Sequence, residues 1–175
     1  MQLYISDLAE AGRVERSGEA SPVLLVLTFV LGLVVGSFLN VVIHRLPRGQ
    51  SLAWPPSSCP QCGRRLGVLE LVPVLSFLAQ GGRCRGCGER IPWRYPLVEL
   101  LTGVLLAAVA ARHPEPGRLV FYGWLTAVLV AAAFIDLEHR IIPNRLLAAG
   151  LAGGAVLLAW LSRGRLGARI RSAGA

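Results

Sequence analysis

Four cysteines are the residues of this chain whose type and spacing most clearly suit chemistry. They form two Cys-x-x-Cys pairs, Cys59–Cys62 and Cys84–Cys87, with 21 residues between the pairs. Four thiolates at this spacing are typical of a structural zinc ribbon, in which they close a tetrahedral metal site. Two disulfides, a redox-active pair and plain buried cysteines are the alternatives. Of these, the spacing favours zinc.

The charge around the cysteines indicates their compartment. The loop from Arg45 to Pro96 carries eight arginines and only two acids, Glu70 and Glu89. Arginine-rich loops beside membrane-spanning segments normally remain in the cytoplasm. Thiols are kept reduced there, so the location argues for metal binding and against disulfides.

The composition indicates a membrane protein. Of the 175 residues, 54% are hydrophobic, which is more apolar surface than one soluble core of this size can bury. The net charge of +8 comes from arginine alone, since the chain has no lysine. The arginines lie beside apolar segments and are not interleaved with aromatic residues for base stacking. Anionic lipid therefore explains the charge better than nucleic acid does.

Four apolar segments could enter the bilayer, which predicts an all-α polytopic membrane protein. They are Pro22–Ile43, Leu97–Ala111, Leu119–Ile135 and Leu146–Ser162. The first is long enough for the roughly 20 residues that a spanning helix needs, and the other three are short for a span. Gly32 and Gly36 in the first segment have a spacing that could let a second helix approach closely, or that arises by chance.

These segments divide the chain into five parts. We expect a polar tail at 1–21, a first transmembrane helix at 22–44, a cysteine domain at 45–96, further transmembrane helices at 97–162 and a basic tail at 163–175. The charge pattern predicts an N-terminus outside the membrane and a small, zinc-ribbon-like cysteine domain in the cytoplasm. The basic tail conflicts with this alternation, because it would lie outside.

Between the cysteine pairs, an apolar stretch runs from Leu66 to Leu78. Pro73 interrupts it, and it is too short to span a bilayer. Two interpretations remain open. The stretch is either an interfacial or re-entrant element held against the membrane surface, or a small hydrophobic core of the ribbon itself.

Four motifs follow one another between Pro22 and Leu147. They are Gly36–Pro47 at the end of the first helix, the cysteine run Cys59–Cys87, Arg94–Gly103 at the start of the second helix, and Phe134–Asn144. Together they resemble the bacterial prepilin peptidases, the type IV prepilin leader peptidase and N-methyltransferase family. In that family the last motif bears the first catalytic aspartate, which corresponds to Asp136 here.

The resemblance implies an aspartic endopeptidase of the bacterial inner membrane. Such an enzyme removes the short basic leader from prepilins of type IV pili, or from the related pseudopilins of type II secretion, on the cytoplasmic side. Many family members then methylate the new N-terminus with S-adenosylmethionine. The chain contains no glycine-rich phosphate loop or dinucleotide fingerprint, so that cofactor rests on the resemblance alone.

Asp136 is the candidate catalytic residue. It ends an apolar segment at the predicted cytoplasmic interface, and a carboxylate near the membrane interior is a functional candidate because it is costly to keep there. From position alone, Asp136 could equally be the polar end of a helix. The resemblance favours the catalytic role.

A second catalytic carboxylate is missing from the pattern. Aspartic hydrolysis normally uses one ionised and one protonated carboxyl group. In the family the partner lies in a later Gly-x-Gly-Asp motif, which this chain lacks, and the only other aspartate is Asp7 in the N-terminal tail.

Three explanations compete for this absence. The chain is truncated or frame-shifted, a separate polypeptide or a second copy supplies the partner, or Glu99 substitutes for it. For Glu99 we weigh a plainer role, a helix-entry residue paired with an arginine such as Arg94. The rival to the enzyme is a catalytically incomplete, zinc-binding membrane module that docks a secretion or pilus-assembly partner.

Overall fold

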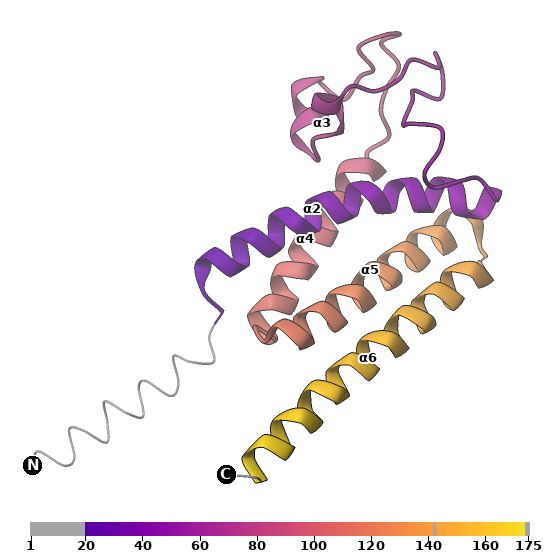
Figure 1. The fold of residues 1–175 in the computed structure, drawn as a ribbon. Helices are drawn as coiled ribbons and strands as arrows, with labels where there is room; N and C mark the ends of the chain where they lie inside the picture. The colour runs from indigo at the N-terminus through magenta and orange to yellow at the C-terminus, as the bar shows by residue number, and fades with distance from the viewer. Residues whose placement is uncertain (1–19, 142, 174–175) are drawn as a thin grey trace, which may run out of the picture.

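The structure of the protein is a computed structural model that describes residues 20–141 and 143–173, with side chains described as far as Arg163. Asp7 and nearly all of the expected N-terminal tail lie outside the described residues. The long helices are α2 (Pro22–Arg45), α4 (Arg94–Arg112), α5 (Pro116–His139) and α6 (Asn144–Ala173) (Figure 1). Between α2 and α4 lie three short helices, η1 (Leu46–Arg48), η2 (Val68–Leu71) and α3 (Leu75–Ala79).

The predicted fold class is confirmed. Four helices are long and apolar enough to cross a membrane. Within the described residues there is no β-strand, and the cysteine domain contains only two isolated bridges, Ser58–Arg65 and Arg83–Arg90.

The last three candidate spans are longer than the sequence suggested. They cover 19, 24 and 20 residues, so the expectation that they are short for a span was wrong. The apolar runs underestimate the helices because each helix continues into polar residues at its ends. In α5, for example, Pro116 occupies the first turn and His139 ends the helix.

Helices α2 and α4 pack at very short distance through glycine. A Cβ atom built on Gly32 would lie 2.6 Å from the Cα atom of Gly103, and one on Gly36 would lie 2.7 Å from the Cα atom of Glu99. No side chain fits in that space, so the close approach requires glycine on α2. The Gly32/Gly36 spacing is therefore a true packing motif, which Asn40 reinforces by donating a hydrogen bond to the Tyr95 carbonyl at 3.1 Å.

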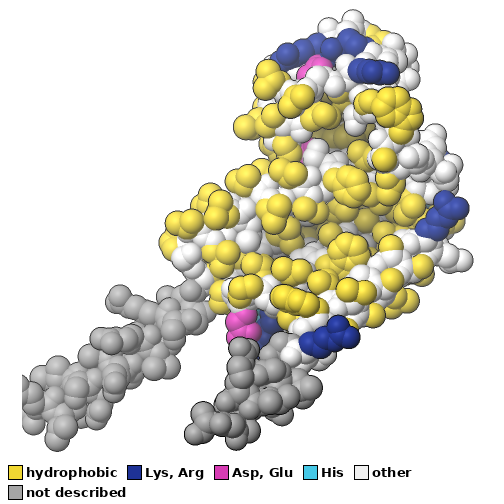
Figure 2. All heavy atoms as spheres, in the orientation of Figure 1, with side chains coloured by type: hydrophobic (Ala, Val, Ile, Leu, Met, Phe, Trp, Pro, Cys, Tyr) yellow, Lys and Arg dark blue, Asp and Glu magenta, His cyan; other side chains and the backbone are white. Residues whose placement is uncertain are grey.

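The buried core lies at one end of the helix bundle. Ile43 near the end of α2, Val98 near the start of α4 and Ile135 near the end of α5 are all fully buried, and Leu146 at the start of α6 joins them. The cysteine domain and Asp136 are attached to this same end. Elsewhere the helices expose large apolar side chains, as expected of lipid-facing surfaces (Figure 2).

Candidate metal centre and the Asp136 turn

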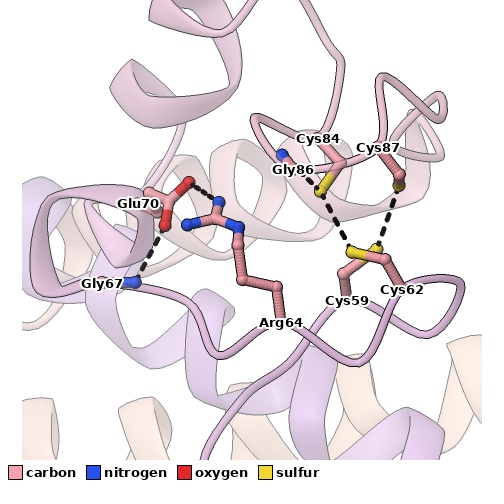
Figure 3. Close-up of polar contacts among 8 residues, drawn as sticks. All are labelled: Cys59, Cys62, Arg64, Gly67, Glu70, Cys84, Gly86 and Cys87. Atoms are coloured by element: carbon pink, nitrogen blue, oxygen red, sulfur yellow. Dashed lines mark hydrogen bonds and ion pairs between the residues drawn. The ribbon is translucent and has the colours of Figure 1, made fainter.

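The four cysteine sulfurs converge on one point (Figure 3). All lie within 4.8 Å of one another, with 3.9 Å between Cys59 and Cys87 and 4.0 Å between Cys62 and Cys84. Sulfurs bonded tetrahedrally to zinc at about 2.3 Å would lie about 3.8 Å apart. All four cysteines are free thiols, so the disulfide alternative is not found. The donor set and its spacing therefore fit a metal ion.

Two turns with the same backbone pattern present these thiols. In the first, the Cys59 amide donates to the Arg64 carbonyl and the Gly63 amide donates to the Cys59 carbonyl, both at 2.9 Å. In the second, the Cys84 amide donates to the Glu89 carbonyl at 2.8 Å, and the Gly88 amide donates to the Cys84 carbonyl at 2.9 Å.

Glycine is needed at the same position of each turn. Gly63 has φ +69° and Gly88 has φ +72°, a conformation that L-residues with side chains rarely adopt. Each turn thus directs two thiols toward the other turn, and four ligands are assembled from two copies of one local structure.

The backbone around the second pair favours a thiolate. Hydrogen bonds from the amides of Cys87 and Gly86 lower the pKa of the Cys84 thiol to about 6. For exposed Cys87, the Glu89 amide lowers the pKa, but partial desolvation and the three neighbouring thiols outweigh it and raise the pKa to about 11. Because thiolates are the metal-binding form, Cys84 is ready to bind at neutral pH.

Glu70 connects the first cysteine turn to η2. Its carboxylate binds the Arg64 guanidinium at 2.5 Å and accepts from the Gly67 amide at 2.9 Å (Figure 3). These two contacts, the guanidinium first, hold the pKa of Glu70 below its ordinary value. The apolar stretch after the first cysteine pair is thereby fixed to the metal centre.

Beyond η2, the chain makes a rare turn at Val74. The Leu75 amide donates to the Pro73 carbonyl at 2.5 Å, and Val74 has φ +60° and ψ −51°. These are the features of a γ-turn of the strained kind, which a β-branched residue seldom forms. The Val74 amide donates to Oε2 of Glu99 at 2.8 Å, so a carboxylate of α4 holds the turn in place.

This contact corrects the sequence-based pairing of Glu99. Glu99 is buried and accepts from Val74, whereas Arg94 binds Glu138. Residues 94 and 99 are five apart, so they point to different faces of α4, and pairs on one face are three or four apart. The Glu99 carboxylate thus has a structural partner in the cysteine domain.

Asp136 lies in the last turns of α5, at the end of the bundle that bears the cysteine domain. It is exposed, and it directly follows the fully buried Ile135. Its carbonyl accepts from the Arg140 amide at 2.8 Å, and Arg140 ends the helix with φ +53°. No other aspartate occurs among the described residues, and no hydrogen bond in this part of the chain joins Asp136 to Glu99.

The Arg94–Glu138 ion pair was not foreseen from the sequence. It joins the first residue of α4 to a residue two positions beyond Asp136, across 44 positions of sequence. No local pattern signals a contact between residues so far apart. The ion pair links the end of the cysteine domain to the Asp136 turn.

The hollow shown on α2 does not suit S-adenosylmethionine, the cofactor that the family name implies. The hollow is shallow and is lined by Pro22, Val23, Val26 and Leu27, which offer only apolar contacts. A charged sulfonium compound with an amino acid moiety needs polar partners, so this hollow does not fit it.

Comparison with known proteins gives one consistent result. Residues 30–113 match the family described as the bacterial peptidase A24 N-terminal domain. The chain is 50% identical over 140 residues to a prepilin leader peptidase/N-methyltransferase of Myxococcus xanthus (strain DK1622), covering 80% of this chain and 42% of the relative. Proteins of the same name from Dichelobacter nodosus and Bacillus subtilis (strain 168) are 38% and 40% identical, over 153 and 124 residues.

The match covers the relatives only in part. It includes 72% of this chain and 54% of the Dichelobacter protein, and 71% and 50% for the Bacillus protein. The chain thus spans about half the length of the curated relatives it matches. No solved structure matches the chain.

Proposed function

The chain belongs to the prepilin leader peptidase/N-methyltransferase family, and we propose that it takes part in hydrolysis of the leader peptide of a prepilin or pseudopilin. The proposed site is the cytoplasmic face of the bacterial inner membrane. The observation that carries the proposal is the position of Asp136, an exposed carboxylate that ends an apolar helix beside the cysteine domain. A substrate helix leaving the bilayer would present its cleavage site at this level.

Asp136 would act as one carboxylate of an aspartic pair. In such a pair, one ionised carboxylate removes a proton from the attacking water, and the other, protonated, donates to the carbonyl or the leaving amine. Glu99 is a poor second member, because it is buried and already bound to the Val74 amide. We place the second carboxylate either on another polypeptide or on a second copy of the chain, whose own Asp136 would then complete the pair.

The cysteine cluster would hold a structural zinc ion. Cys59, Cys62, Cys84 and Cys87 would fill all four positions of a tetrahedral site, which leaves none open for water or substrate. Bound there, zinc would supply folding energy to a domain that has no strands of its own in the described residues. Methyl transfer is not assigned to any residue of the described chain.

The test measures leader cleavage by the full chain in membranes. Cleavage is detected as a decrease in the mass of a prepilin-like substrate. Asp136→Asn should abolish cleavage and leave zinc content and membrane insertion unchanged. Glu115→Gln is the matched control, because Glu115 is also an exposed acid but immediately precedes α5, at the end opposite to Asp136. Cleavage by Asp136→Asn at the wild-type rate would exclude Asp136 as a catalytic residue.

A second function is favoured by the lack of another aspartate in the described residues. In this alternative the chain is a zinc-binding membrane module that binds an assembly partner and does not cut. Absence of cleavage by well-inserted, zinc-loaded wild-type protein would support it. Recovery of cleavage when a protein bearing a Gly-x-Gly-Asp segment is co-expressed would instead support a two-part enzyme.

A further inference from the structure

The cysteine domain turns a set of large apolar side chains outward. We call this set the outward patch, and its members are Val68, Leu69, Leu75, Leu78 and Trp93. Their exposed fractions lie between 63% and 83%, which is high for side chains of this kind. The exposure argues against the interpretation of this stretch as the hydrophobic core of a ribbon.

The members of the outward patch belong to one connected surface. Helices η2 and α3, which carry four of them, contact each other. Trp93 packs its ring on Phe77 of α3, with 4.8 Å between the ring centroids. An apolar surface of this kind on a small domain marks an interaction site.

The Glu99–Val74 hydrogen bond sets the height of the outward patch relative to the membrane. Glu99 lies five residues after Arg94, the first residue of a candidate membrane span. At 1.5 Å per residue, this places Glu99 about 7.5 Å along the span. Val74, bound to it at 2.8 Å, immediately precedes α3.

Helix α3 therefore lies beside the first turns of α4, and Figure 1 shows it next to that end of the helix. That level corresponds to the boundary between lipid headgroups and acyl chains, where apolar faces of interfacial helices are buried by about 5–10 Å. Leu75 and Leu78 of the outward patch thus lie near the level at which α4 enters its candidate span.

The charge of the domain complements the same location. Five exposed arginines surround the cysteine turns, at positions 64, 65, 83, 85 and 90. Figure 2 shows arginine side chains gathered at the end of the molecule that carries this domain. Apolar side chains next to basic ones are the composition of surfaces that bind anionic membranes.

We propose that the outward patch inserts into the membrane leaflet on the side of the cysteine domain, and that the neighbouring arginines bind anionic phospholipid headgroups there. The cysteine domain is then an interfacial anchor, and the Val74 turn sets its depth. This inference rests on insertion of the four spans and does not depend on peptidase activity.

The test measures the surroundings of single sites in the full chain. Nitroxide side chains are introduced as unnatural amino acids, which leaves the four thiols untouched, at Leu69, Leu75 and Arg85. The zinc-loaded protein is placed in nanodiscs of phosphatidylcholine and phosphatidylglycerol. Accessibility to oxygen, which concentrates in lipid, is compared with accessibility to a water-soluble nickel chelate.

Lipid insertion predicts a several-fold higher oxygen-to-nickel accessibility ratio at Leu69 and Leu75 than at Arg85. Nickel accessibility at Leu75 equal to that at Arg85 would mean a solvated patch and would overturn the proposal. Low accessibility to both reagents at Leu75 would mean that protein covers the patch, as a partner or a second copy would, and would overturn it too.

A separate comparison tests whether the arginines of the cysteine domain bind anionic headgroups. Removal of phosphatidylglycerol should lower the oxygen-to-nickel ratio at Leu75. The triple variant Arg65→Gln, Arg83→Gln, Arg90→Gln should lose this dependence while its zinc content stays unchanged. Arg112→Gln with Arg118→Gln is the matched control, because these arginines lie at the other end of α4 and in α5. A ratio independent of phosphatidylglycerol in the wild-type protein would exclude headgroup binding.

Discussion

Arg94 donates from a single nitrogen, Nη1, to both carboxylate oxygens of Glu138, at 2.5 and 2.6 Å. Arg94 is the first residue of α4 and Glu138 is the second-last residue of α5. Both side chains are less than one-third exposed. The ion pair therefore fixes the start of α4, where the cysteine domain ends, to the turn that contains Asp136.

Loss of either charge should loosen this connection. We expect Arg94→Gln and Glu138→Gln each to lower the free energy of unfolding by about 1–2 kcal/mol, because each leaves a partly buried charge without its partner. The double variant should be less destabilised than the sum of the two. Thermal unfolding of the wild-type protein and the three variants in detergent measures this double-mutant cycle. If the two single effects on stability add up to the effect of the double variant, the two side chains do not interact.

The close packing of α2 against α4 predicts a contrast between two glycines. Gly36→Ala would put a methyl group 2.7 Å from the Glu99 Cα atom, so we expect a loss of about 1–3 kcal/mol of unfolding free energy. Gly154→Ala is the matched control, because nothing lies within 4 Å of the Cβ position and alanine favours helix. Equal stability of the two variants would contradict the observed packing.

Metal binding should weaken at acidic pH. The pKa of Cys84 is lowered to about 6, so its thiolate is present above that pH and is lost below it. Affinity for zinc should therefore decline gradually below the Cys87 pKa of about 11 and more steeply below about 6, where Cys84 also takes up a proton. Competition with a chromophoric chelator across this range measures the affinity. If the zinc affinity stayed constant as the pH fell to the pKa range of ordinary carboxyl groups, this would argue against thiolate ligands.

Glu99 should be replaceable by glutamine but not by leucine. Glutamine keeps an oxygen that accepts from the Val74 amide, whereas leucine leaves this half-buried amide without a partner. An unpaired amide costs about 1–3 kcal/mol, so Glu99→Leu should be the less stable variant by about that amount. A nitroxide label at Leu75 should likewise be less accessible to oxygen in Glu99→Leu than in Glu99→Gln. Equal behaviour of both variants would show that the hydrogen bond does not hold the turn.

Two kinds of prediction from sequence were confirmed. The four candidate membrane spans follow from runs of apolar residues, since a bilayer requires about 20 of them wherever a helix crosses it. The convergence of the four thiols follows from two short local motifs, each closed by a glycine with positive φ. In both cases the information lies within a few turns of chain. The catalytic role of Asp136 remains a prediction, and the lengths of the last three spans were underestimated because helices continue past their apolar residues.

The sequence by itself therefore determined the class of apolar, membrane-type helices and the four thiols that could bind a metal ion, and it offered Gly32 and Gly36 as possible packing residues. Only the tertiary structure decided which helix meets those glycines, that Glu99 binds the Val74 amide, and that Arg94 binds Glu138. These contacts join residues 25 to 71 positions apart, and each depends on the relative placement of two elements. Composition and spacing indicate which groups a residue can bind. Which partner residue it contacts depends on how the helices pack against one another.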